Sequence, residues 1–263
     1  MTTNEVWTES RLLDDYSRPM NQSGRNIPAA HSMDTEWFAV DEDGHVARLA
    51  TNEGGAVPEG GGFPHGDSRN GGSWLWLDEQ ALVAAALKLL AGRDSSVASV
   101  LDEFELSAED VAPLVLYGHP FDGQRNALGC LGLFVYRCQS QQAAPYPLLV
   151  RPAHPLVFDE LPEEVRSQFQ PGYWPERFEH EKLIQPLEAT ACETWGGGWW
   201  VDRAGEMHIL EGTEKQIDDG WAAAIIDEAR SVEEQPANYE DFLEYLERAC
   251  RTTIRLREEK SAT

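Results

Sequence analysis

The run from Cys192 to Trp200 departs furthest from ordinary composition, because it places a thiol beside Glu193 and three consecutive glycines between tryptophans. A nucleophilic cysteine needs a neighbouring base and an oxyanion hole, which exposed N–H groups of the glycines could supply. The passage has no sequence signature of a cysteine protease. We therefore prefer a small structural residue at Cys192, and a catalytic thiol is the alternative.

The tryptophans of this passage allow two interpretations. Most tryptophans lie in protein cores, but tryptophan is also enriched at the centres of protein interfaces. An exposed Trp199 or Trp200 would be flanked by the carboxylates of Glu193 and Asp202. These four residues are the candidate partner-binding residues.

The spacing of the aspartates and histidines does not match a known metal-binding motif. Asp41-x-Asp43-Gly44 resembles the start of a calcium loop, but such a loop needs glycine sixth and glutamate twelfth. Here glycine is fourth and Asn52 is twelfth, which favours a simple turn. No two of the seven histidines are separated by four residues, the spacing of a helical metal site. The sequence predicts no metal, no cofactor and no catalytic residue.

Two β-hairpins of one geometry should position these residues. The first spans 37–49, with Gly44 at the positive-φ position of its turn, and the second spans 199–210. Trp200 to Gly205 aligns with Ala39 to Gly44, so both turns share an aspartate followed three residues later by glycine.

Helical periodicity and capping residues predict helices over 79–91, 96–104, 218–230 and 239–255, the last capped by Asn238. Gly92 should end the first. Ser107 and Asp110 resemble a capping box that Pro113 soon interrupts, and Pro162 marks another helix start. We expect strands over 131–137 and 148–150, the latter an edge strand between prolines. The glycine-rich loop 54–72 lacks the Lys-Ser/Thr of a phosphate loop.

We expect one α+β domain over 33–255, an antiparallel sheet of hairpins with four or five flanking helices. Residues 1–32 show no apolar period, so they are either a disordered arm or chain upstream of a natural start at Met33. Residues 256–263 should form a flexible tail.

Charge limits the class of partner. The 263 residues include 46 acidic and 21 basic side chains, a formal charge of −25 at pH 7. Such a surface repels phosphates, which argues against nucleic acid and against anionic membranes. The sequence has no apolar run long enough to span a membrane and no signal peptide. Its four cysteines suit reduced thiols, so we expect a cytoplasmic protein.

The segment Met33-Asp-x-x-Trp37-Phe-Ala-Val-Asp41-x-Asp43-Gly44-His-Val46, with Glu53-x-Gly55-Ala-Val-Pro58 after it, resembles an uncharacterised family of bacterial proteins that also tend to start at this methionine. The likeness continues through Pro145-Tyr-x-x-Leu-x-x-Pro, Leu161-Pro and Cys192-x-x-Trp195-Gly. It covers most of 33–200 and implies no activity.

A shorter likeness lies near the C-terminal end. Gly198-x-x-x-Asp202-x-x-Gly205, a helix, and then Asn238-Tyr-Glu-Asp-Phe242-Leu243 look like the end of SUKH-type immunity proteins. The helix and LP-x-x-Y opening of those proteins has no counterpart where it should stand. The resemblance implies a binder that neutralises a toxin.

Together, the acidity and the lack of a catalytic set predict a non-catalytic module that binds a basic protein, an immunity-type protein being one form of it. The alternative is a hydrolase or transferase of unknown substrate, with its site near Cys192 and the loop 54–72. An enzyme is thus left open but not preferred.

Overall fold

The computed structural model describes residues 36–51, 56–58, 79–118, 121–139, 144–167, 172–189, 192–193, 199–209 and 219–261. The expected arm 1–32 and most of the glycine-rich loop 54–72 lie outside the described residues. None of the helices in the described ranges is long and apolar enough to cross a membrane.

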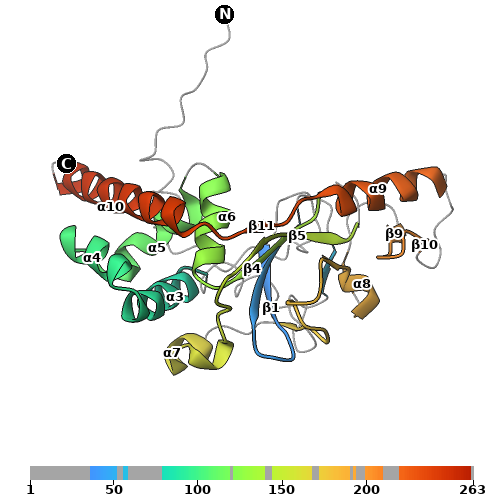
Figure 1. Cartoon of the computed structure of the whole chain (residues 1–263), viewed down its shortest axis with the longest axis horizontal. Coiled ribbons are helices and arrows are strands. Elements are labelled where there is room, and N and C mark those ends of the chain that lie inside the picture. The colour runs from blue at the N-terminus through green and yellow to red at the C-terminus, as the bar shows by residue number, and fades with distance from the viewer. Residues whose placement is uncertain are drawn as a thin grey trace, which may run out of the picture.

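A seven-stranded mixed sheet forms the centre of the fold (Figure 1). Its strands follow the order β11-β5-β4-β2-β1-β6, and β7 also pairs with β5. The strands are β1 (Glu36–Val40), β2 (Val46–Ala50), β4 (Phe134–Arg137), β5 (Tyr146–Arg151), β6 (Gly172–Tyr173), β7 (Leu183–Ile184) and β11 (Gln235–Pro236).

The predicted α+β class is confirmed, but the expectation of a purely antiparallel sheet is wrong. The β1–β2 hairpin is antiparallel, whereas β2 pairs with β4, β1 with β6 and β5 with β11 in parallel. A parallel pair needs a crossover connection. Between β2 and β4 the chain makes that crossover through four helices, which a local hydrophobic pattern does not reveal.

The described ranges contain eight α-helices, more than the four or five expected. They are α3 (Glu79–Arg93), α4 (Ser95–Glu103), α5 (Ala108–Tyr117), α6 (Phe121–Cys130), α7 (Glu163–Arg166), α8 (Pro186–Ala189), α9 (Asp219–Ser231) and α10 (Tyr239–Ser261). A 3₁₀ turn, Phe158–Glu160, precedes α7.

Predicted helix starts are accurate where a side chain caps the backbone. Ser107 and Asp110 form the expected capping box of α5. The Asn238 side-chain oxygen accepts the N–H of Glu240 at 3.1 Å at the start of α10. Helix ends fared worse, since α3 continues through Gly92 and α5 contains Pro113.

Two segments differ from expectation because their apolar residues are buried. β5 is an inner strand between β4 and β11, not an edge strand, and Leu148 is only 2% exposed. The helix α10 extends to Ser261 with Leu256 buried, so most of the expected tail 256–263 is ordered helix.

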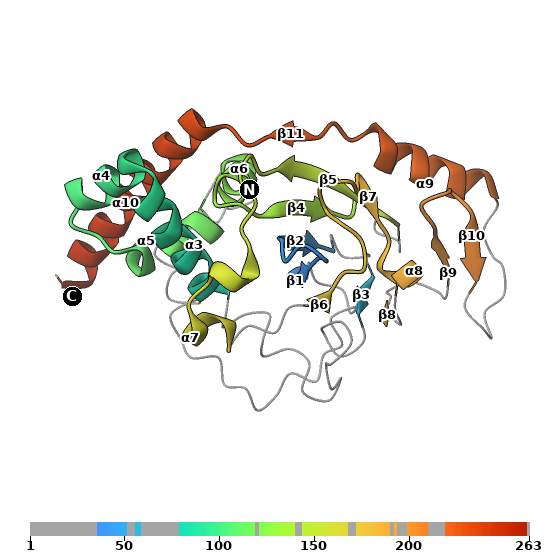
Figure 2. The ribbon, with the colours of Figure 1, turned by 60° about the horizontal axis from the view of Figure 1, so that its bottom comes forward.

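The sheet is buried on both faces because successive residues of its strands point to opposite sides. Phe38, Val46 and Val135 pack in one core beneath α3, α4, α5, α6 and α10. Trp37 and Tyr136 belong to the other core, which α9 and an aromatic group around Phe178 cover. Figure 2 shows the helical layer at one end and α9 at the other.

Two small sheets complete the fold. β3 (Val57–Pro58) pairs with β8 (Cys192–Glu193), and β9 (Trp199–Val201) pairs with β10 (Met207–Ile209), both antiparallel. The β9–β10 hairpin lies beside α9, at the end of the molecule away from α10 (Figures 1 and 2).

Candidate functional site

The β9–β10 turn is built in the same way as the β1–β2 turn. Asp202 N donates to Glu206 O at 3.0 Å, and Gly205 N donates to Asp202 O at 3.1 Å. Gly205 has φ +94°, and a Cβ there would lie 2.8 Å from a side-chain carbon of Ile226. Glycine is therefore required both by backbone conformation and by the approach of α9.

The two faces of this hairpin have different surroundings. Val201 is fully buried in the second core, and Met207, its partner in register, is partly buried against the same core. Trp200 and His208, the adjacent cross-strand pair, therefore point to the opposite face. Their rings stack with centroids 4.2 Å apart and an interplanar angle of 17°. We call this side the outer face of the hairpin.

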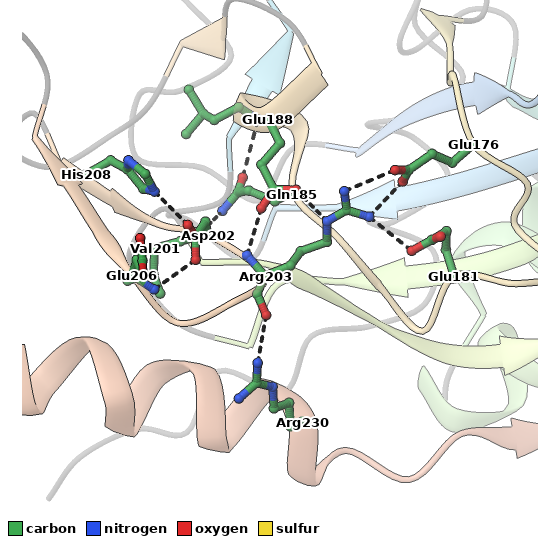
Figure 3. Close-up of polar contacts among 11 residues, drawn as sticks. Glu176, Glu181, Gln185, Glu188, Val201, Asp202, Arg203, Glu206, His208 and Arg230 are labelled. Atoms are coloured by element: carbon green, nitrogen blue, oxygen red, sulfur yellow. Dashed lines mark hydrogen bonds and ion pairs between the residues drawn. The ribbon is translucent and has the colours of Figure 1, made fainter.

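Two carboxylates continue the outer face beyond the stacked rings (Figure 3). The Asp202 carboxylate lies 2.7 Å from His208 Nε2 through Oδ2 and accepts Glu206 N at 2.8 Å through Oδ1. Burial works to raise the pKa of Asp202, but the hydrogen bonds with His208 and Glu206 N outweigh it and lower the pKa. Asp202 is thus anionic at neutral pH.

One ligand atom each from Asp202, Glu206 and His208 lies within 4.8 Å of the others. Asp202 and His208 are half-buried, and Glu206 is exposed. Two carboxylates and one imidazole are donors that suit a divalent transition metal. This is the group of described residues with the geometry to hold a metal ion.

Arg203, next to Asp202, is held by three glutamates, an arrangement that we call the Arg203 clasp (Figure 3). Its Nη1 donates to Glu176 at 2.7 Å and to Glu181 at 3.0 Å, and its Nε donates to Glu188. Burial, followed by repulsion from Glu176, raises the pKa of Glu181 against the attraction of Arg203. The clasp fixes the hairpin to α8 and to the chain between β6 and β7.

Further hydrogen bonds anchor the backbone of the hairpin. Arg230 of α9 donates from Nη2 to the carbonyl oxygen of Arg203 at 2.8 Å. The side-chain nitrogen of the buried Gln185 donates to Val201 O at 2.7 Å. The outer face is therefore presented on a firmly attached element.

The structure describes the side chains of only two of the four partner-binding residues predicted from the sequence. Trp200 and Asp202 lie together on the outer face, as the structure describes them. Glu193 lies in β8 and Trp199 in β9, but the side chains of both fall outside the described part of the structure, as does that of Cys192. The loop 54–72, the other half of the alternative enzyme site, lies mostly outside it too.

Asp41, at the rejected calcium motif, is occupied by backbone donors. Its carboxylate accepts N–H groups of Asp43 at 3.0 Å, His45 at 2.8 Å and Phe178 at 2.9 Å. It is 2% exposed, so its role is to hold the turn against the second core.

The thiols with described side chains are poorly suited to nucleophilic chemistry. Burial raises the pKa of Cys130 to about 12 and that of Cys250 to about 12. Cys138 is fully buried. Because the thiolate is the nucleophile, burial makes these three cysteines weak nucleophiles.

Sequence reasoning missed Glu206, His208 and the Arg203 clasp. A helical spacing of histidine pairs does not apply to this set, which combines two carboxylates with one histidine around the turn of a hairpin. The usable signal was Asp202-x-x-x-Glu206-x-His208, because a turn after Asp202 places the other two residues beside it across the hairpin.

Comparison with known proteins adds no relative, since no family model, no curated protein and no solved structure matches this chain.

Proposed function

We propose that this protein is a non-catalytic module that binds a basic protein through the outer face of the β9–β10 hairpin. The observation that carries the proposal is the half-buried Trp200, stacked on His208 beside two carboxylates. An amphipathic ring held in one orientation loses little entropy on binding, which is why tryptophan recurs at interface hot spots.

The charge around this face supports a basic partner. Asp202 and Glu206 lie on the face, and the three glutamates of the Arg203 clasp, which share one guanidinium, lie next to it. The whole chain carries −25. Fields of this sign attract cationic proteins and speed their association. A toxin-neutralising protein of the immunity type, acting in the cytoplasm, is the specific form of binder we propose.

The alternative function, a hydrolase or transferase, is distinguished from binding by the experiment described below. No observation on the described residues favours it over binding.

The proposal is tested by isolating a basic partner from the native host at low salt and measuring its binding kinetics across a salt series. Surface charges are screened over about 8 Å at physiological ionic strength and about 3 Å at 1 M. The on-rate should fall steeply with salt, while the off-rate changes less.

Variants separate the contribution of the Trp200 contact from that of the charged residues. Trp200→Ala should raise the off-rate about 30-fold, the effect of losing about 2 kcal/mol at a hot spot. Asp202→Asn with Glu206→Gln should lower the on-rate and flatten its salt dependence. Glu258→Gln with Glu259→Gln, an equal charge change on exposed residues of α10, is the matched control. An on-rate indifferent to salt, or turnover of a small metabolite lost in Cys192→Ser, would overturn the proposal.

A further inference from the structure

We propose that Asp202, Glu206 and His208 bind one divalent transition-metal ion on the outer face of the β9–β10 hairpin, with zinc the best match. The inference rests on the geometry of these three side chains and does not require the proposed binding function, although both involve the carboxylates of Asp202 and Glu206.

The donor atoms are close to a chelating arrangement. Zinc lies about 2.1 Å from nitrogen and oxygen ligands, so two donors on a tetrahedral ion stand roughly 3.4 Å apart. The three donors here already lie within 4.8 Å of one another, and His208 Nε2 is 2.7 Å from Asp202 Oδ2. The pair has to open by less than an ångström, and the exposed Glu206 side chain can close the remaining distance by rotation.

The first ligand is held in place before any ion arrives. Asp202 Oδ1 accepts Glu206 N, which fixes the carboxylate plane and leaves Oδ2 directed at the imidazole. The Trp200 ring stacked on His208 restricts the imidazole in the same way. Supporting contacts of this kind orient metal ligands and strengthen binding.

The local charges leave room for a dication. Within the described chain, the Glu206 carboxylate forms no ion pair, although it lies beside the anionic Asp202. The neighbouring Arg203 is fully engaged by the three glutamates of its clasp. A neutral imidazole and two carboxylates would balance the charge of one divalent ion.

The first hairpin shows that the turn itself does not need these side chains. Its capping aspartate, Asp41, makes the equivalent hydrogen bonds. The residue six positions after Asp41 is Ala47, whereas the residue six positions after Asp202 is His208. The position four residues on, equivalent to Glu206, holds His45. Glu206 and His208 are therefore additions to a turn that already folds, which favours a binding role.

Three protein ligands leave at least one coordination position of the ion for water or an incoming donor. An imidazole nitrogen with two carboxylate oxygens suits zinc better than calcium or magnesium, which prefer all-oxygen sites.

The test is titration of the full chain, stripped of metal with a chelator, with Zn²⁺ by calorimetry. The wild type should bind one ion per chain at this site. Glu206→Gln should weaken this binding at least tenfold without loss of thermal stability, because Glu206 is exposed and unpaired among the described residues. His208→Ala should abolish it. His180→Ala, which removes an exposed histidine in the chain between β6 and β7, is the matched control and should bind as the wild type does.

Tryptophan fluorescence gives a second, independent measurement. Cu²⁺ or Ni²⁺ bound at His208 should quench Trp200, whose ring lies against the imidazole. The quenching should be absent in His208→Ala and much smaller in Trp200→Phe. Zn²⁺ binding that is unchanged in both Glu206→Gln and His208→Ala, or no binding at millimolar ion, would overturn the proposal.

Discussion

Asp41 and Asp202 occupy equivalent positions in two hairpins of one geometry. Each carboxylate accepts the N–H four residues further along at 2.8 Å, and each carbonyl accepts the N–H of a glycine with positive φ. Their surroundings differ: Asp41 is buried and also accepts Phe178 N, whereas Asp202 lies on the outer face. The same turn geometry thus packs the first hairpin against the second core, and it places the carboxylate of the second hairpin on the outer face.

This difference predicts unequal effects on stability. Asp41→Ala should cost about 3 kcal/mol, because the buried N–H of Phe178 and two partly buried N–H groups lose their acceptor, and an unsatisfied buried donor alone costs about 1–3 kcal/mol. Asp202→Ala should cost about 1 kcal/mol, the usual value for a lost cap near solvent. Urea unfolding in the presence of a chelator measures both, and equal losses would contradict this interpretation.

The Arg203 clasp should contribute more than an ordinary surface ion pair. Arg203→Ala should lower the free energy of unfolding by about 2 kcal/mol, because three neighbouring glutamates lose their common partner. Arg203→Lys should restore only part of this, since an ammonium cannot form forked pairs. Arg177→Ala is the control, because Arg177 pairs with Asp43 at 3.3 Å while half exposed. A loss there comparable to that of Arg203→Ala would argue against the clasp.

The helix α10 should be indispensable to the first core. Phe242 is fully buried, and truncating a buried phenylalanine costs about 3–5 kcal/mol. Phe242→Ala should therefore destabilise the protein strongly. Glu244→Ala, two residues on and exposed, should change stability by less than about 0.5 kcal/mol. Denaturant unfolding followed by circular dichroism compares the two, and similar small effects would mean that α10 does not support the core.

The Arg151–Glu234 pair predicts a loss of stability in acid. The hydrogen bond from Arg151, at 2.5 Å, lowers the pKa of Glu234 against the opposing effect of burial. The folded state therefore binds this proton less readily than the unfolded state, so the stabilisation is present above the ordinary glutamate pKa of about 4.3. It should disappear as the pH falls through the lowered pKa. Urea unfolding should show wild type exceeding Glu234→Gln by about 1–2 kcal/mol at pH 7, and the gap should close in acid.

Glu181 should show the opposite dependence and serves as the control for that experiment. Its pKa is raised, first by burial, so its protonation is easier in the folded state. Relative to Glu181→Gln, the wild type should gain stability as the pH falls and lose it as the pH rises through the raised pKa. Gaps that move in the same direction for both glutamates would refute the assigned causes.

Short-range features of the fold were predictable from the sequence. The two hairpin turns, the capping of α10 by Asn238 and the capping box of Ser107 each depend on hydrogen bonds between residues within four positions of one another. Local hydrogen bonds determine them, so a local pattern is sufficient.

The helix α6 shows why other features were not predictable. Its sequence contains Gly123 and Gly129, which disfavour a helix. A Cβ at Gly123 would lie 2.7 Å from the ring of Tyr245, and one at Gly129 would lie 2.4 Å from Val150. The glycines permit α10 and β5 to approach, so packing compensates for the poor propensity. That reason is visible only in three dimensions, as are the parallel strand pairs and the Arg203 clasp.

The segment 219–261 passes from α9 along β11 at the edge of the sheet to α10, so a single stretch of chain covers both of its faces (Figure 2). During synthesis, every strand of the sheet except β11 leaves the ribosome before either cover is complete. Ile226 of α9 and Phe242 of α10, only sixteen residues apart in sequence, close the two cores almost together. Helices α3 to α6 precede β4 in the chain and can cover part of one face early, but neither core is complete until α9 and α10 have emerged, so apolar surface stays exposed late into translation.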